Sequence, residues 1–161
     1  RADGRLVGPR ITTTPADTGM STSIADWDAI ATITLGGVHS DVAADFSTTN
    51  NPNGVWQYGW STMLGSPFVL STHPAVRDGV ATWRGDLEPF RNPAEYHNGT
   101  TSVLILGDTN PMNPGQFALH PGPNGENAVV RYVAPETGTA SIASIFSSVD
   151  IFETTTDFTS Y

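Results

Sequence analysis

Residues 53–60 read Asn-Gly-Val-Trp-Gln-Tyr-Gly-Trp, and the fold class follows from this stretch more than from any other. Asn-Gly favours the positive φ angles of a tight hairpin turn, and aromatic side chains alternate with smaller ones after it. Because successive side chains of a strand point to opposite faces, this alternation places Trp56, Tyr58 and Trp60 on one face. The segment therefore predicts a β-strand that is entered through a turn.

The same turn chemistry recurs along the chain and divides it into short segments. Asn-Gly returns at Asn98-Gly99 and Asn124-Gly125, and proline-containing breaks fall at Asn51-Pro52, Ser66-Pro67, His73-Pro74, Asn92-Pro93, Asn110-Pro111, Asn113-Pro114 and His120-Pro121-Gly122-Pro123. Between the breaks lie runs rich in β-branched and aromatic residues: Val55–Thr62, Phe68–Thr72, Ser102–Leu106, Gln116–His120, Ala128–Ala134, Thr139–Val149 and Ile151–Thr159. This spacing predicts an all-β, antiparallel β-sandwich of the jelly-roll-like kind.

The N-terminal part of the chain is harder to interpret. Residues 1–22 show no periodicity and are expected to form an extended arm, which leaves residues 23–161 as the sandwich domain. Ser23 is a possible helix cap, but residues 29–35 fit a strand equally well, and we favour the strand. At most one or two short helices are expected.

Composition excludes several classes of function. The 161 residues carry a net charge of −9, and all seven basic residues are arginine, so no basic stripe is available for nucleic acid. The longest aliphatic run, Val103–Leu106, is far too short for a transmembrane segment. The chain has no cysteine and begins at Arg1, which fits a mature exported protein whose signal peptide was removed, and also fits a fragment.

Motifs for catalysis are missing from the sequence. It contains no nucleophile elbow, zinc-protease motif, P-loop or dinucleotide fingerprint. Asp86 and Glu88 are the obvious candidates for a glycosidase-like carboxylate pair, but acidic residues near Trp83 and Pro89 are more typical of a solvated loop. We therefore expect no catalytic residue and no enzymatic activity.

Metal binding has little support either. The four histidines are widely separated and share no ligand spacing, so independent roles and no metal site are expected. Calcium is a possible cofactor, because loop positions supply hard oxygen ligands from Asn50, Asn51, Asn53, Asp108, Asn110, Asn113 and Asn124. Turn formation alone explains most of these residues.

The aromatic row supplies the candidate ligand-binding residues: Trp56, Tyr58 and Trp60, with Trp83 as a fourth. A flat row of rings suits a sugar, whose C–H faces stack on indole. The alternative is that the same row fills the core of the sandwich, where aromatic rings bury large areas. Gly59 between the rings indicates that something approaches closely, either a neighbouring strand or a ligand.

The segment from Leu119 to Gly125 predicts a rigid structural turn. Two prolines fix φ while two glycines and Asn124 permit positive φ, so the turn is expected to set the register of the strands on either side. His120 is expected to hydrogen-bond a carbonyl of this turn. The alternative is that His120, Asn124 and Glu126 line a pocket for a ligand or an ion.

Several segments resemble a family of bacterial exported β-domains, found in proteins with a PEP-CTERM-type sorting tail and in planctomycete envelope proteins. The resemblance lies in Phe46–Trp60, Gly115–Gly125, Ala128–Pro135 and Thr154–Asp157, and it covers about residues 44–158. It implies a jelly-roll-like fold, an exported location and carbohydrate binding. Members of that family continue past the last of these segments for several more strands, so this sandwich is expected to lack C-terminal strands.

Together these features predict a non-catalytic extracytoplasmic binding module, located in the periplasm, on the cell surface or outside the cell. The expected ligand is carbohydrate. The alternative is a structural accessory subunit that docks on another envelope protein within a larger assembly, with the N-terminal arm wrapping a neighbour.

Overall fold

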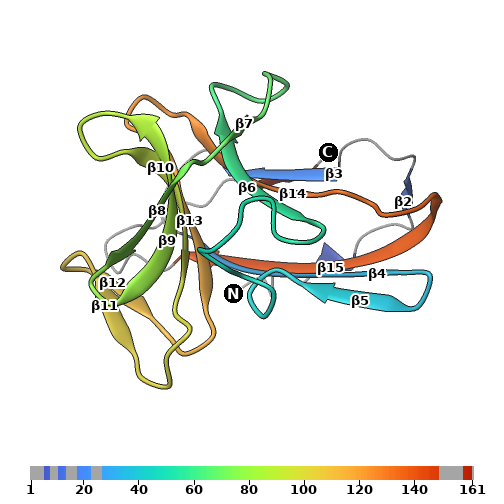
Figure 1. Ribbon diagram of the computed structural model, residues 1–161, viewed down its shortest axis with the longest axis horizontal. Helices are drawn as coiled ribbons and strands as arrows, with labels where there is room; N and C mark the ends of the chain where they lie inside the picture. The colour runs from blue at the N-terminus through green and yellow to red at the C-terminus, as the bar shows by residue number, and fades with distance from the viewer. Residues whose placement is uncertain (1–5, 8–10, 14–17, 23–26, 149–157, 161) are drawn as a thin grey trace.

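The structure, a computed structural model, describes residues 6–7, 11–13, 18–22, 27–148 and 158–160, with side chains from 32 to 147. Within these ranges every regular element is a strand and none is a helix, and every strand pairing is antiparallel (Figure 1). The predicted all-β sandwich is therefore confirmed. No helix in the described residues is long and apolar enough to span a membrane.

The larger sheet has nine strands in the order β1-β15-β4-β13-β10-β9-β8, with β2 added to β15 and β5 added to β4. Its strands are Leu6–Val7 (β1), Ile11–Thr13 (β2), Trp27–Leu35 (β4), Val38–Asp41 (β5), His73–Arg77 (β8), Val80–Leu87 (β9), Asn92–His97 (β10), Phe117–His120 (β13) and Gly138–Ser148 (β15). In Figure 1, β4, β5 and β15 lie nearly horizontal while β8, β9 and β10 run steeply, so the sheet is strongly twisted.

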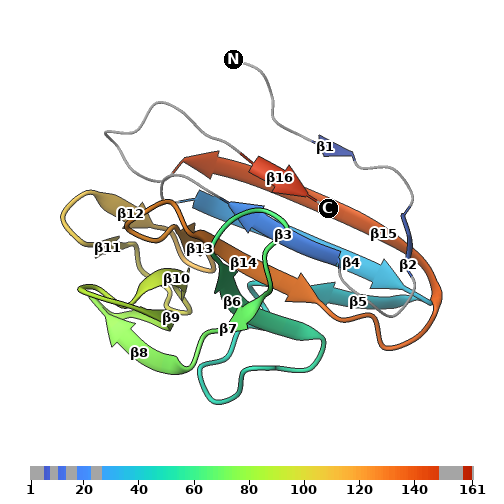
Figure 2. The same cartoon turned by 90° about the horizontal axis from the view of Figure 1, so that it is seen from above.

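The smaller sheet has five strands in the order β16-β3-β14-β6-β7. They are Thr18–Thr22 (β3), Trp56–Ser61 (β6), Val69–Leu70 (β7), Asn127–Tyr132 (β14) and Phe158–Ser160 (β16). Figures 1 and 2 together show β3 and β14 as a second layer over β4 and β15. A separate hairpin is formed by Leu104–Leu106 (β11) and Asn110–Met112 (β12).

The main core lies between the two sheets. The larger sheet contributes Ile33, Leu35, Trp83, Phe117, Leu119 and Ala140, and the smaller sheet contributes Trp56, Tyr58, Ala128, Val130 and Tyr132. A second core forms where β11 and β12 pack with β9, β10 and β13, through Val80, Ala94, Tyr96, Leu106, Met112 and Ala118. The larger sheet is thus buried on both faces at its β9–β10–β13 end.

The structure agrees with the sequence for most predicted strands. β6, β7, β11, β13, β14 and β15 fall within a residue or so of the predicted runs, and the favoured strand at 29–35 is part of β4. The parts of the N-terminal arm that the structure describes are extended, and they pair with β15 and β14. Most of the predicted run Ile151–Thr159 lies outside the described residues.

Three of the seven proline-containing positions were interpreted wrongly as breaks, whereas the prolines of the other four lie between strands as predicted. His73-Pro74, Asn92-Pro93 and Asn110-Pro111 instead begin β8, β10 and β12. Proline lacks the N–H that a central strand needs, but it is tolerated at sheet edges and at bulges. β8 is an edge strand, and the register of β10 against β9 shifts between Asn92 and Ala94.

The prediction for the turn from Leu119 to Gly125 is also wrong in part. It joins β13 of the larger sheet to β14 of the smaller one, so it does not set the register of a hairpin. It is held by hydrogen bonds from the Gly122 N–H to the Glu126 carbonyl (2.8 Å) and from the Gly125 N–H to the Gly122 carbonyl (3.2 Å). As expected, the His120 ring bonds a carbonyl of this turn, with Nδ1 2.6 Å from the Pro121 oxygen.

Candidate functional site

The four aromatic residues proposed as ligand-binding are buried. Trp56 is 1% exposed, Tyr58 0%, Trp60 9% and Trp83 5%. The Trp56 indole donates to Asp45 Oδ2 (3.0 Å), and that of Trp83 donates to the Ser47 carbonyl (2.7 Å). A sugar cannot stack on rings that have no open face, so the interpretation of this row as an exposed platform is corrected: the rings are part of the interior.

Gly59 of β6 allows Phe68 and β7 to approach this strand closely. A Cβ atom at this position would collide with the Val69 carbonyl oxygen and the Phe68 ring. The close approach expected from the sequence is therefore that of a neighbouring strand, β7. Phe68 in turn lies under the Arg131 guanidinium, whose carbon is 4.2 Å from the ring centroid.

A polar cluster lies on the surface where β8 begins and β9 ends. His73 is the first residue of β8 and pairs across the sheet with Arg84, two residues before Asp86 on β9. This register brings His73 Nε2 to 2.6 Å from Asp86 Oδ1. Arg91, in the turn between β9 and β10, places Nη1 2.9 Å from His73 Nδ1. The site thus joins three segments of the chain.

The hydrogen bonds fix the protonation pattern of His73. A guanidinium can only donate, so Nδ1 of neutral His73 accepts from Arg91, and the ring proton is on Nε2, which donates to Asp86. Both ring nitrogens are therefore engaged. A general base needs a free lone pair directed at a substrate, and His73 has none in this arrangement.

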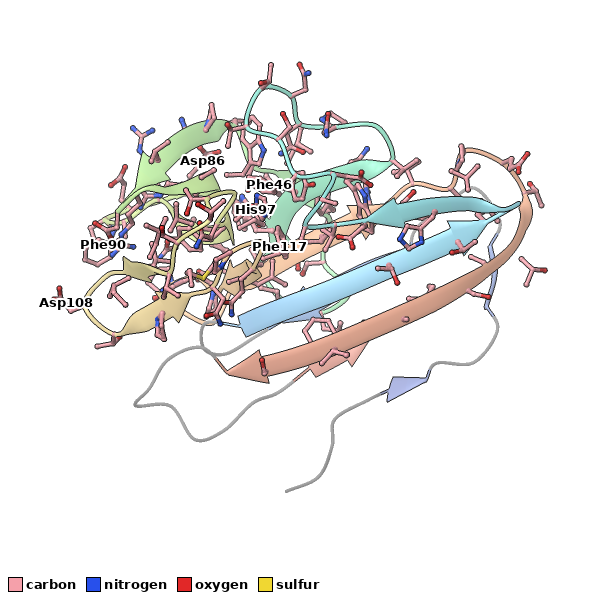
Figure 3. All side chains as sticks on the ribbon, turned by 90° about the horizontal axis from the view of Figure 1, so that it is seen from below. Phe46, Asp86, Phe90, His97, Asp108 and Phe117 are labelled. Atoms are coloured by element: carbon pink, nitrogen blue, oxygen red, sulfur yellow. The ribbon has the colours of Figure 1, made fainter. Side chains whose placement is uncertain are left out.

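Phe90 stands beside this cluster in the turn between β9 and β10. Phe90 is 63% exposed, which is unusual for a ring of this size, and Figure 3 shows it at the same end of the molecule as Asp86. The next residue, Arg91, has a φ of 52°, in the left-handed region that a non-glycine residue rarely adopts. Such backbone strain often marks a functional position.

The possible carboxylate pair of the sequence does not form a shared acidic centre. Asp86 interacts with His73, whereas Glu88 Oε1 lies 3.8 Å from Nε of Arg91. The side chains of Asp86 and Glu88 are 52% and 72% exposed. Each carboxylate thus faces its own nitrogen partner, as expected for surface groups.

The described residues contain no group of three or more His, Cys, Asp or Glu side chains that could hold a metal ion. Calcium also binds amide and backbone oxygens, so its role stays a prediction. One of the suggested asparagines has a structural role: Asn51 Nδ2 donates to the carbonyls of Tyr58 (2.7 Å) and Ser71 (2.8 Å).

Glu95 is a group that the sequence interpretation missed. It is 0% exposed on β10, opposite Trp83 of β9 and Leu119 of β13, and neither carboxyl oxygen has a hydrogen-bond partner. Burial raises the pKa of Glu95 well above its ordinary value, and the nearby Ser71 hydroxyl offsets part of the rise. Ser71 Oγ nevertheless makes no hydrogen bond of normal geometry. The neutral acid is therefore favoured in the folded protein.

No family model, no curated protein and no solved structure matches this chain. The resemblance to exported bacterial β-domains consequently stays a prediction.

Proposed function

We propose that this protein is a non-catalytic extracytoplasmic binding module whose ligand is carbohydrate. The observation that carries the proposal is Phe90, an aromatic ring 63% exposed beside the cluster of His73, Asp86 and Arg91. The site is therefore proposed at the β9–β10 turn and not at the buried aromatic row. The exported location rests on the resemblance of the Phe46–Trp60 and Gly115–Gly125 segments.

The chemistry of the cluster suits a sugar. One face of a pyranose presents C–H groups that pack on an aromatic ring, while its hydroxyls both donate and accept hydrogen bonds. Asp86 and Glu88 offer acceptors and Arg91 offers donors beside Phe90, and their exposed side chains leave them within reach of a ligand. A few placed polar groups around an apolar surface are typical of small-molecule recognition.

Two features favour binding without catalysis. His73 has both ring nitrogens engaged, so it offers no free base. Asp86 and Glu88 each lie beside a nitrogen partner, and both are open to water instead of being enclosed in a site that excludes it.

A pull-down on insoluble polysaccharides (cellulose, chitin, xylan and peptidoglycan) tests the proposal. The wild-type protein is expected to be retained by at least one of them, and Phe90→Ala to lose about tenfold in affinity, because a stacked ring contributes about 1–1.5 kcal/mol. Val103→Ala is the matched control, since Val103 is 54% exposed and lies outside the cluster. Equal retention of both variants, or none of the wild-type protein, would reject this site.

A second candidate is the accessory subunit of a larger envelope assembly. It is favoured by the loop between β6 and β7, where Met63 and Leu64 are 64% and 55% exposed. The loop is ordered by hydrogen bonds from the Ser66 N–H to the Met63 carbonyl and from Thr62 Oγ1 to Ser66 Oγ, each 3.0 Å. A preformed apolar tip loses little entropy on docking. In size-exclusion chromatography of a native envelope extract, the double variant M63S/L64S should then elute at the position of the monomer, and F90A should not.

A further inference from the structure

Glu95 lies under the point where the chain passes from one sheet to the other. β7 ends at Leu70 in the smaller sheet, and β8 begins at His73 in the larger sheet, so Ser71 and Thr72 form the crossover (Figure 1). Ser71 is 1% exposed, and its hydroxyl is close enough to Glu95 to lower the pKa of that carboxyl. The carboxyl is therefore shut off from water by the crossover on one side and by β9 and β13 on others.

The crossover is held by a small number of backbone hydrogen bonds. The Ser71 N–H donates to the Tyr58 carbonyl (3.0 Å), and Asn51 Nδ2 donates to the Ser71 carbonyl (2.8 Å). Asn51 Oδ1 in turn accepts from the Tyr58 N–H (2.9 Å). These contacts tie the crossover to β6, and among the described residues no hydrogen bond of normal geometry joins Ser71 Oγ to the Glu95 carboxyl.

Among the described residues, the groups around Glu95 offer no positive charge to pair with its carboxylate. On β6, Tyr58 faces it with a phenol whose pKa is raised by burial and by the carboxylates of Asp45 and Glu95. On β10 itself His97 shares its face, and burial lowers the pKa of that ring from its ordinary value of 6.5, so it is neutral at pH 7. The facing residues of β9 and β13, Trp83 and Leu119, are not titratable acids or bases.

We propose that ionisation of Glu95 releases the crossover from the core, so that the joint between the two sheets is sensitive to pH. A carboxylate with no partner in this interior needs water, and the crossover is the thinnest cover above it. Opening requires only the few hydrogen bonds that hold Ser71, whereas opening between β10 and β9 or β13 would break a sheet. The inference does not depend on the ligand of the surface cluster.

The direction of the effect follows from proton linkage. Above the ordinary pKa of a glutamate, near 4.5, an exposed Glu95 has released its proton while the buried one has kept it. Opening therefore releases one proton, and its equilibrium constant rises about tenfold per pH unit until the buried group also ionises. Low pH keeps the crossover closed, and rising pH opens it.

Backbone hydrogen exchange, measured by NMR in the full chain, tests this proposal. The rates are expressed as protection factors, which remove the intrinsic pH dependence of exchange. In the wild-type protein the protection of the Ser71 N–H should fall about tenfold per pH unit above pH 5, and it should stay well below that of β15 amides, which exchange through global unfolding. In Glu95→Gln, which is neutral and nearly the same shape, the Ser71 N–H should keep constant protection. Glu88→Gln removes an exposed charge from the same region and should behave as wild type.

Three outcomes would overturn the proposal: constant protection of the Ser71 N–H in the wild type, a slope that persists in Glu95→Gln, or a protection of the Ser71 N–H as high as that of β15 amides. The last would show that the Ser71 N–H exchanges only through global unfolding. If Glu95→Gln does not fold, Ser71→Ala gives a second test with Glu95 in place. Loss of the hydroxyl that lowers the pKa should extend the falling range to higher pH. An unchanged range in that variant would also count against the proposal.

Discussion

Asp86 and Glu95 both carry a carboxyl group and lie on neighbouring strands, β9 and β10, but their surroundings differ. Asp86 is half exposed and interacts with His73 at 2.6 Å, whereas Glu95 is fully buried and neither of its oxygens is hydrogen-bonded. The aromatic residues show the same division, because Trp83 is 5% exposed and Phe90 is 63% exposed. One end of the larger sheet therefore combines a buried interior with an exposed polar surface.

The largest expected effect comes from removing a ring on the buried side. Trp83→Ala should lower the free energy of unfolding by about 4 kcal/mol, because it leaves a cavity in the main core and the Ser47 carbonyl without its donor. Phe90→Ala should change it by less than about 0.5 kcal/mol. Urea unfolding followed by tryptophan fluorescence measures both. Similar losses of unfolding free energy in the two variants would contradict this difference between the buried and the exposed ring.

Glu95→Gln should be the next largest change and is expected to stabilise the protein. Because the folded pKa of Glu95 is raised, stability falls as pH rises above about 4.5, and the variant lacks this loss. We expect a gain in the free energy of unfolding at pH 8 and almost none at pH 4. Thermal unfolding at both pH values checks this, and a variant less stable than wild type at pH 8 would show that Glu95 has a partner there.

Asp86→Asn should have the smallest effect. An asparagine oxygen can still accept from Nε2 of His73, and exposed pairs contribute little, so a loss below about 1 kcal/mol is expected at pH 7. The same unfolding experiment measures it. A loss as large as that of Trp83→Ala would mean that the surface cluster holds the fold together.

The sequence was sufficient for the fold class and for about half of the described strands, because alternation and turn residues are local signals. It did not settle which face of β6 is buried, since the row of Trp56, Tyr58 and Trp60 fits a core and an open surface equally well. The packing of the two sheets against each other decides which face is buried. β8 and β10 were missed because a proline near the start of each was interpreted as a break.

The candidate site was less accessible to sequence reasoning. Phe90 lies in the run Glu-Pro-Phe-Arg-Asn-Pro, which has no periodicity, and nothing local brings His73 to Asp86. Glu95 carried a weak signal. In Ala94-Glu95-Tyr96-His97 the apolar residues alternate with polar ones, which predicts a strand with an exposed polar face, but here the second sheet covers that face as well.

The most direct test of the proposed binding surface is an NMR titration of the ¹⁵N-labelled protein with a soluble oligosaccharide of the polysaccharide that retains it. The account predicts that backbone signals of His73, Phe90 and Arg91 shift with a common dissociation constant, while the indole N–H signals of Trp56, Trp60 and Trp83 stay in place because those rings are buried. Shifts of the indole signals without shifts at Phe90 and Arg91 would contradict it, and would return the ligand to the aromatic row.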